Sequence, residues 1–162
     1  MSKASEVELS PSESLLRALD INFRITRYLI ENIPSEAWSA EPAGGKGRTI
    51  AAITAHTHNV RRMWLKVASG KPVPDEVDRH TLTPRSALAA LDASASAVHE
   101  MVAESLASGK RIKNFKPDTT AFAGYIIAHD AHHRGQIAML ARQGGFALPK
   151  QVDFGMWEWG IR

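Results

Sequence analysis

Four stretches of this 162-residue sequence repeat apolar residues every three or four positions, the spacing of one face of an α-helix. Proline or glycine ends each stretch: Pro34, Gly70, Gly109 and Gly144. A residue suited to capping a helix precedes each of the first three stretches: Ser10, Thr49 and Thr83. Proline follows Ser10 and Thr83, at the first helical position. The pattern predicts an all-α protein with helices over residues 11–33, 50–69, 84–108 and 120–143.

The length suits one domain over residues 1–162, and we expect residues 1–9 to be flexible. The last sixteen residues, ALPKQVDFGMWEWGIR, lack a helical period and are predicted to form a non-helical tail. This tail carries three large aromatic residues, Phe154, Trp157 and Trp159. Aromatic side chains this dense favour a tail that folds back on the helices. We expect these aromatic side chains to pack in the core or in a dimer interface rather than to line a substrate pocket.

Charge and composition exclude several classes of partner. The 20 basic and 17 acidic residues leave a net charge of +3, too balanced to indicate nucleic acid. No segment reaches the roughly 18 apolar residues of a membrane span, and no signal-peptide pattern is visible, so we expect a cytoplasmic protein. Because the chain contains no cysteine, a metal site would have to use histidine or carboxylate ligands.

The predicted fourth helix carries an unusual histidine pair. His129 and His133 are four residues apart, so they project from one helical face, a turn apart. The rest of this face is apolar: Phe122, Ile126, Ile137 and Leu140. Leaving a buried polar ring unpaired costs about 1 to 3 kcal/mol, so both imidazoles need partners. Metal coordination and hydrogen bonds to a facing helix both meet this need, and the spacing alone does not choose between them.

A third histidine of the right orientation comes from the predicted second helix. His56 lies three residues after Ile53 and four before Val60, on the inward face. His58 is turned away from it by about 200°. The helical faces therefore predict a metal site formed by three histidines: His56, His129 and His133.

The remaining polar residues of these motifs are given lesser roles. We place His58 and His132 at the edge of the site or at a subunit contact, with His99 as a weaker neighbour and His80 as a bystander in a loop. Asp130 follows His129 as the glutamate follows the first histidine in H-E-x-x-H zinc helices. A helical neighbour points about 100° away, so we do not expect Asp130 to act as a base. Arg134 and Gln136 are expected to have structural roles.

The chain resembles the DinB-like superfamily of bacterial metal-binding four-helix bundles, which includes the YfiT-like proteins. The family places a histidine after a T-[IV] pair near the start of the second helix and H-x-x-x-H-R-G-Q on a late helix. Here these read T-I-A-A-I-T-A-H, from Thr49 to His56, and H-D-A-H-H-R-G-Q, from His129 to Gln136. The resemblance implies an up-down-down-up bundle, homodimers, and His56, His129 and His133 as metal ligands. The long link from Gly70 to Leu82 fits the crossover of that topology.

Three imidazoles leave a divalent ion with an open position, as in catalytic zinc sites. Some members of the family resemble thiol-dependent transferases. We therefore expect a metal-dependent thiol (S-)transferase or a hydrolase acting on a small molecule, with zinc or nickel ahead of iron. A low-molecular-weight thiol would have to be a cosubstrate, because the chain has no cysteine. The alternatives are a noncatalytic metal-binding or stress-response module with a structural ion, and an interaction protein whose histidines only hydrogen-bond to neighbours.

Overall fold

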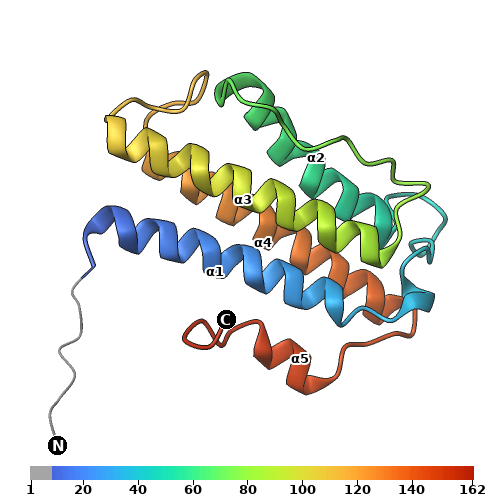
Figure 1. The fold of residues 1–162 in the computed structure, drawn as a ribbon. Helices are drawn as coiled ribbons and strands as arrows, with labels where there is room; N and C mark the ends of the chain where they lie inside the picture. Colours follow the sequence, from blue (N-terminus) through green and yellow to red (C-terminus); the bar gives the residue numbers. More distant parts are fainter. Residues whose placement is uncertain (1–8) are drawn as a thin grey trace, which may run out of the picture.

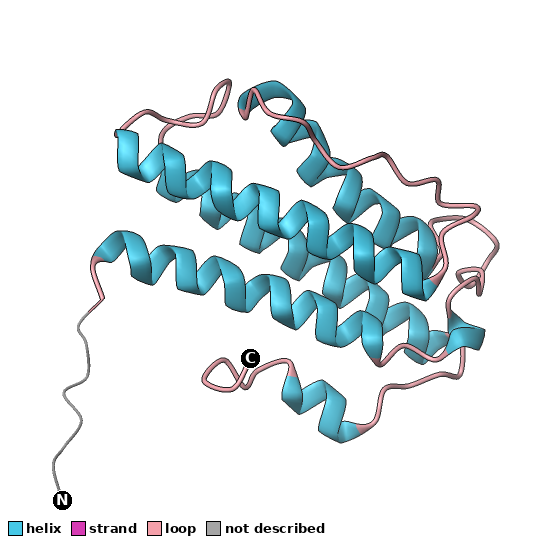
Figure 2. Cartoon of the chain, in the orientation of Figure 1, coloured by secondary structure: helices cyan, strands magenta, loops and turns pink. Residues whose placement is uncertain are grey.

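A computed structural model describes residues 9–162, so the expected flexibility of residues 1–9 falls almost wholly outside the described part. Within that part the regular structure is entirely helical (Figure 2). The elements are α1 (Pro11–Glu31), the 3₁₀ turn η1 (Ser35–Ala37), α2 (Ile50–Ala68), α3 (Pro84–Ser108), α4 (Thr119–Gln143) and α5 (Lys150–Gly155). The four long helices agree with the predicted ones to within two residues at each end.

The predicted caps account for these ends. Ser10 and Glu13 form a capping box at the start of α1, and the Thr49 hydroxyl accepts a hydrogen bond from the backbone N–H of Ala52. At the end of α3, Gly109 takes a left-handed backbone conformation, with φ of 67°. Local sequence therefore sets where the helices begin and end, independently of how they pack.

The long helices form a bundle in which α1 and α2 each pack against both α3 and α4 (Figure 1). In Figure 1, α1 and α4 run in one direction and α2 and α3 in the other, which is the expected up-down-down-up order. The segment of residues 69–83 runs back along the bundle, so that α3 can lie parallel to α2. This arrangement brings the middle of α2 next to the middle of α4, which carry the predicted histidines.

Two apolar clusters fill the bundle, with a polar layer between them. One cluster contains Leu29, Ile53 and Ile137, and the other contains Phe23, Leu65 and Phe122. In α1, α2 and α4, buried polar residues lie between the stretches that contribute to the two clusters: Thr26, Arg61, Asp130 and His133. Asn22, beside Phe23, joins this layer through its hydrogen bond to Asp130. The histidine motif thus lies where the apolar core is interrupted.

The tail folds back on the bundle, as expected, but it is not wholly non-helical. Its large aromatic side chains do not pack in the core as predicted: Phe154, Trp157 and Trp159 are 70%, 79% and 39% exposed. The short helix α5 corrects the prediction for residues 150–155, because six residues are too few to show a helical period. Val152 joins the apolar core, and the guanidinium of Arg162 lies 3.7 Å from the centre of the Tyr28 ring. In the described part of the chain, no helix is both long and apolar enough to cross a membrane.

Candidate metal centre

The bundle brings together the three histidines predicted as ligands. His56 comes from α2 and His129 and His133 from α4, and one ring nitrogen of each lies within 4.8 Å of the other two. The Nε2 atoms of His129 and His133 are 3.2 Å apart. Two nitrogens that share a tetrahedral zinc at about 2.0–2.1 Å would be about 3.3 Å apart. The His129 and His133 pair therefore has the spacing of zinc ligands, and small ring rotations would bring His56 to the same ion.

Gln136 orients His133. Its side-chain oxygen accepts a hydrogen bond from Nδ1 of His133 at 2.8 Å, which leaves Nε2 without a proton and directed at His129. Metal-bound histidines commonly donate their other ring N–H in this way. Gln136 thus acts on a candidate ligand, a role that the sequence prediction missed. Its position three residues after His133 on one helix was the available signal.

The surroundings favour the neutral form of two candidate ligands, His56 and His133. Burial, the positive charge of Arg48 and the neighbouring imidazoles lower the pKa of His56 from 6.5 to about 4. Burial also lowers the pKa of His133, which is 5% exposed, and outweighs the opposing effect of the hydrogen bond that His133 donates to Gln136. Neutral imidazole is the form that binds metal ions. The site can therefore take a cation at neutral pH without first releasing protons from these rings.

Asp130 lies in the polar layer behind His129. Its Oδ2 accepts hydrogen bonds from Arg61 at 2.6 Å and from Asn22 at 2.7 Å, and the Asp130 and Arg61 side chains are 0% and 1% exposed. Burial raises the pKa of Asp130, but the charge of Arg61 and these hydrogen bonds outweigh it and lower the pKa. The carboxylate is therefore held ionised inside the bundle and does not face the open side of the site.

Within residues 9–162, three buried atoms of this cluster have no hydrogen-bond partner: Nε of Arg61, Nδ1 of His129 and Oδ1 of Asp130. The last two lie 3.8 Å apart. A slight ring rotation would let Nδ1–H donate to Oδ1, while Nε2 stayed directed at His133. Carboxylate–histidine–metal arrangements have this form. The unpaired atoms, the donor set and the ligand spacing all fit a divalent ion.

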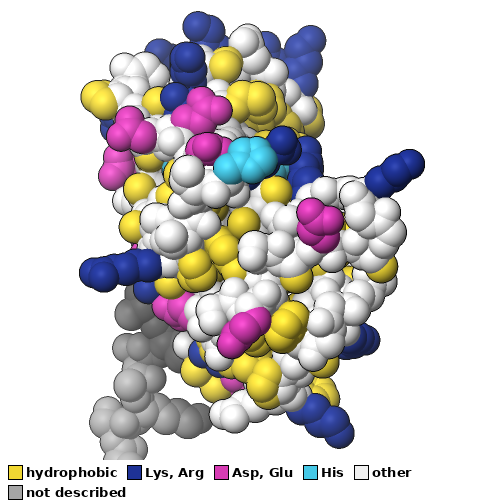
Figure 3. Space-filling view, turned by 90° about the vertical axis from the view of Figure 1, so that its right-hand side faces the viewer, with side chains coloured by type: hydrophobic (Ala, Val, Ile, Leu, Met, Phe, Trp, Pro, Cys, Tyr) yellow, Lys and Arg dark blue, Asp and Glu magenta, His cyan; other side chains and the backbone are white. Residues whose placement is uncertain are grey.

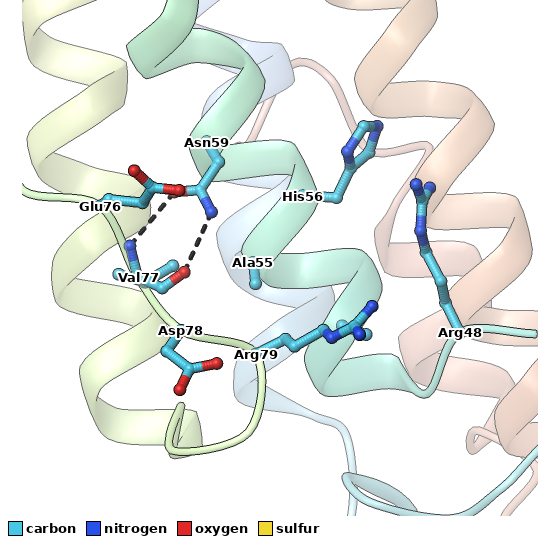
Figure 4. A pocket seen from close by; sticks show the side chains of 9 residues that line it. Arg48, Ala55, His56, Asn59, Glu76, Val77, Asp78 and Arg79 are labelled. Carbon is cyan, nitrogen blue, oxygen red and sulfur yellow. Dashed lines mark hydrogen bonds between the residues drawn. The ribbon is translucent and has the colours of Figure 1, made fainter.

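A hollow of about 490 Å³ opens beside His56, between α2 and the segment that follows it (Figure 4). Asn59 fixes the far wall, because its amide donates to Val77 O at 3.0 Å and accepts from Val77 N at 3.2 Å. Charged side chains line the rest of the hollow: Arg48, Glu76, Asp78 and Arg79. The candidate metal centre is therefore open to small molecules from the side of His56.

The other histidines lie away from this centre, with one exception. His132 is exposed, its ring centre 5.0 Å from that of His133, at the edge of the site as predicted. His58 was predicted there wrongly: it is 1% exposed, and its ring nitrogens lie 2.8 Å from the carbonyl oxygens of Ala90 and Asp75. The face of α2 opposite His56 packs against α3 and against residues 69–83, which we call the crossover segment. His58 therefore links α2 to both of these elements.

His99, given as a weaker neighbour of the site, instead hydrogen-bonds Asp20 on α1 at 2.7 Å. His80 is an exposed loop residue, as predicted. Arg134 has its expected structural role, since its guanidinium donates to Asn22 Oδ1 at 2.7 Å and to Thr26 Oγ1 at 2.8 Å on α1. The tail residues Trp157 and Trp159 line a separate hollow against α4, of about 280 Å³, and not the one beside His56.

Comparison with known proteins supports the family resemblance. The sequence model of the DinB family matches residues 1–160. The chain belongs to the DinB family. Among solved structures, a protein described as a member of this family from Exiguobacterium sibiricum 255-15 superposes with a TM-score of 0.59 at 21% identity, over 90% of this chain and 99% of the other. At that identity the likeness shows the fold alone. Among curated proteins, none matches the chain.

The most informative residues of this DinB-family chain beyond the histidines are Arg61 and Asp130. Sequence reasoning gave Arg61 no role, because a charged residue on an amphipathic helix is usually solvated. The helical period turns it about 140° away from His56, yet its side chain lies inside the bundle, where the Asp130 carboxylate neutralises it. The only sequence signal was a charged residue on each of two helices that also carry inward-facing histidines.

Proposed function

We propose that this DinB-family protein is a metal-dependent thiol (S-)transferase that uses one divalent ion, with zinc or nickel ahead of iron, held by His56, His129 and His133. The observation that carries the proposal is the convergence of three imidazoles from two helices, one of which, that of His56, lines an open hollow. A divalent ion in such a site is a Lewis acid with a free coordination position, able to lower the pKa of a water or thiol.

The chain's own residues favour a thiol over water as the nucleophile. Three carboxylates border the site or its hollow, and each is engaged. Asp130 is bound by Arg61 and Asn22, Glu76 lies 3.4 Å from Arg62, and Asp78 accepts from the backbone N–H of His80 at 2.9 Å. A hydrolase would need one of them as a general base. A thiol, with a pKa of about 8.5, loses its proton far more readily than water, so it depends less on such a base.

The thiol has to come from outside the chain, which contains no cysteine. In the proposed reaction the thiol proton leaves to solvent, the sulfur forms a bond to an electrophilic carbon of the second substrate, and the group on that carbon departs with its electron pair. His56, at the mouth of the hollow, and the hydrogen-bonded pair His133 and Gln136 hold the site in place for this step. Our second proposal is that the same metal site hydrolyses a small-molecule substrate.

Metal analysis with histidine variants tests the proposal. Purified protein should hold about one divalent ion per chain, and His56→Ala, His129→Ala and His133→Ala should each lose it. His132→Ala is the matched control, because His132 neighbours His133 on the same helix but is exposed. Wild-type protein that binds no ion, even after incubation with zinc or nickel, would rule the proposal out.

A second measurement separates an open site from a purely structural one. Calorimetric titration of the zinc-loaded protein with 2-mercaptoethanol should show binding at the metal's free position. If the ion only held α2 to α4, chelation would lower the melting temperature strongly and the loaded protein would bind no thiol. That result would favour the noncatalytic module over the transferase.

A further inference from the structure

We infer that the hollow beside His56 takes a substrate through a single carboxylate group, held by Arg48 and Arg79. This inference deepens the proposed function and rests on it. It concerns the chemical class of the molecule that enters the site, which neither the family nor the histidines specify.

Arg48 stands at the junction of two hollows next to the histidines. It lines the one beside His56 and also a neighbouring one of about 420 Å³, which Gln136 and Met139 border on the α4 side. Its charge helps to lower the pKa of both His56 and His133, so it is close to the candidate ligands of both helices. Over residues 9–162 its guanidinium makes no hydrogen bond or ion pair with another side chain. Its donors are therefore free for a ligand.

Arg79 faces the same space from the crossover segment. Figure 4 shows its side chain passing below His56 toward Arg48. Its Nε donates to His80 Nε2 at 3.1 Å, which leaves its two terminal amino groups available. The segment that carries it is anchored by the two hydrogen bonds between Asn59 and Val77. Arg79 therefore projects from a fixed wall.

The hollow is electrically divided. The two arginines lie at the end nearer His56, whereas Glu76 and Asp78 lie on the opposite wall (Figure 4). On this end face of the molecule, basic side chains lie on one side of a histidine at the surface and acidic side chains lie on the other (Figure 3). An anion is thus attracted to the end at the metal site and repelled from the other.

The chemistry of these groups favours a carboxylate. Guanidinium groups bind planar carboxylates with two parallel N–H···O bonds. A molecule with anions at both ends would place one of them against Glu76 and Asp78. The substrate class that fits is therefore a small molecule with one carboxylate near its reactive end, such as a carboxylate-bearing thiol or its acceptor.

Two thiols that differ in their charged group test this in zinc-loaded protein. Calorimetry should show 3-mercaptopropionate binding about fivefold more tightly than 2-mercaptoethanol, the upper range for an exposed ion pair. Arg48→Ala should lower this ratio, and the double variant Arg48→Ala with Arg79→Ala should bring it to about one, while zinc content and 2-mercaptoethanol affinity stay unchanged. Arg111→Ala is the control, since Arg111 is exposed in the loop at the opposite end of the bundle (Figure 1). A ratio unchanged in Arg48→Ala would overturn the inference.

A metal-free arm separates this inference from the proposed function. Titrating the metal-free protein with propionate should shift the Nε–H NMR signal of Arg48 more than that of Arg111, and propionamide should shift neither. If neither thiol bound the zinc-loaded protein, the transferase proposal would fail, and this titration would still test the carboxylate site. Equal shifts at Arg48 and Arg111 would show nonspecific ion binding only, and would overturn the inference.

Discussion

Replacing Asp130 by asparagine should destabilise the metal-free protein by about 3 to 5 kcal/mol, because it leaves the buried charge of Arg61 without its counter-ion. The pair is fully enclosed, with an N···O distance of 2.6 Å and side chains 1% and 0% exposed. The neutral amide could keep the packing but not the charge. For a chain of this size, that loss corresponds to a melting temperature lower by about 6 to 20 °C.

Urea unfolding of the metal-free variant, followed by circular dichroism, measures this free energy directly, provided that the urea dependence stays unchanged. The matched control is Asp92→Asn. Asp92 is 54% exposed and pairs with Arg27 at the surface, so its replacement should cost at most about 1 kcal/mol. The double variant Arg61→Met with Asp130→Leu should recover most of the lost stability. If Asp130→Asn lowered the free energy of unfolding no more than Asp92→Asn does, the conclusion that Asp130 neutralises the buried charge of Arg61 would be refuted.

Three further predictions follow from the same structure. Gln136→Leu should weaken zinc binding about 10- to 100-fold, because His133 loses its orienting partner. Gln143→Leu is the control and should leave zinc affinity unchanged, since Gln143 is exposed at the end of α4. Competition with a chelator measures the zinc affinity of both variants. His58→Ala should lower the free energy of unfolding by about 2 to 4 kcal/mol while zinc stoichiometry stays at one, since His58 links α2 to α3 and the crossover but lies away from the site. Light scattering should give twice the monomer mass if the chain forms the homodimer that the family resemblance implies, and a monomer mass would contradict that expectation.

Most of the fold could be predicted because its signals are local. Ser10, Thr49 and Thr83 cap the first three long helices where the sequence placed them, and Gly109 ends α3 in the conformation that glycine favours. The choice of His56 over His58 also needed only the helical period. The order of the helices came from family resemblance, since periodicity does not say which helices are parallel.

What could not be predicted depends on packing partners. His58 points away from His56, as the period requires, but only the position of α3 and residues 69–83 makes that side buried. Nothing local in the sequence pairs Arg61 with Asp130, because the pair forms only when α2 and α4 lie side by side. The short helix α5 forms because Val152 packs against the bundle, which six residues of sequence do not reveal.

The account rests on a metal ion at the three histidines, and anomalous diffraction from crystals of protein incubated with zinc tests this most directly. We predict one peak at the zinc edge, about 2.0–2.1 Å from one ring nitrogen each of His56, His129 and His133, with a non-protein group completing the coordination. The absence of a peak there, or a fourth protein ligand closing the site, would contradict the account.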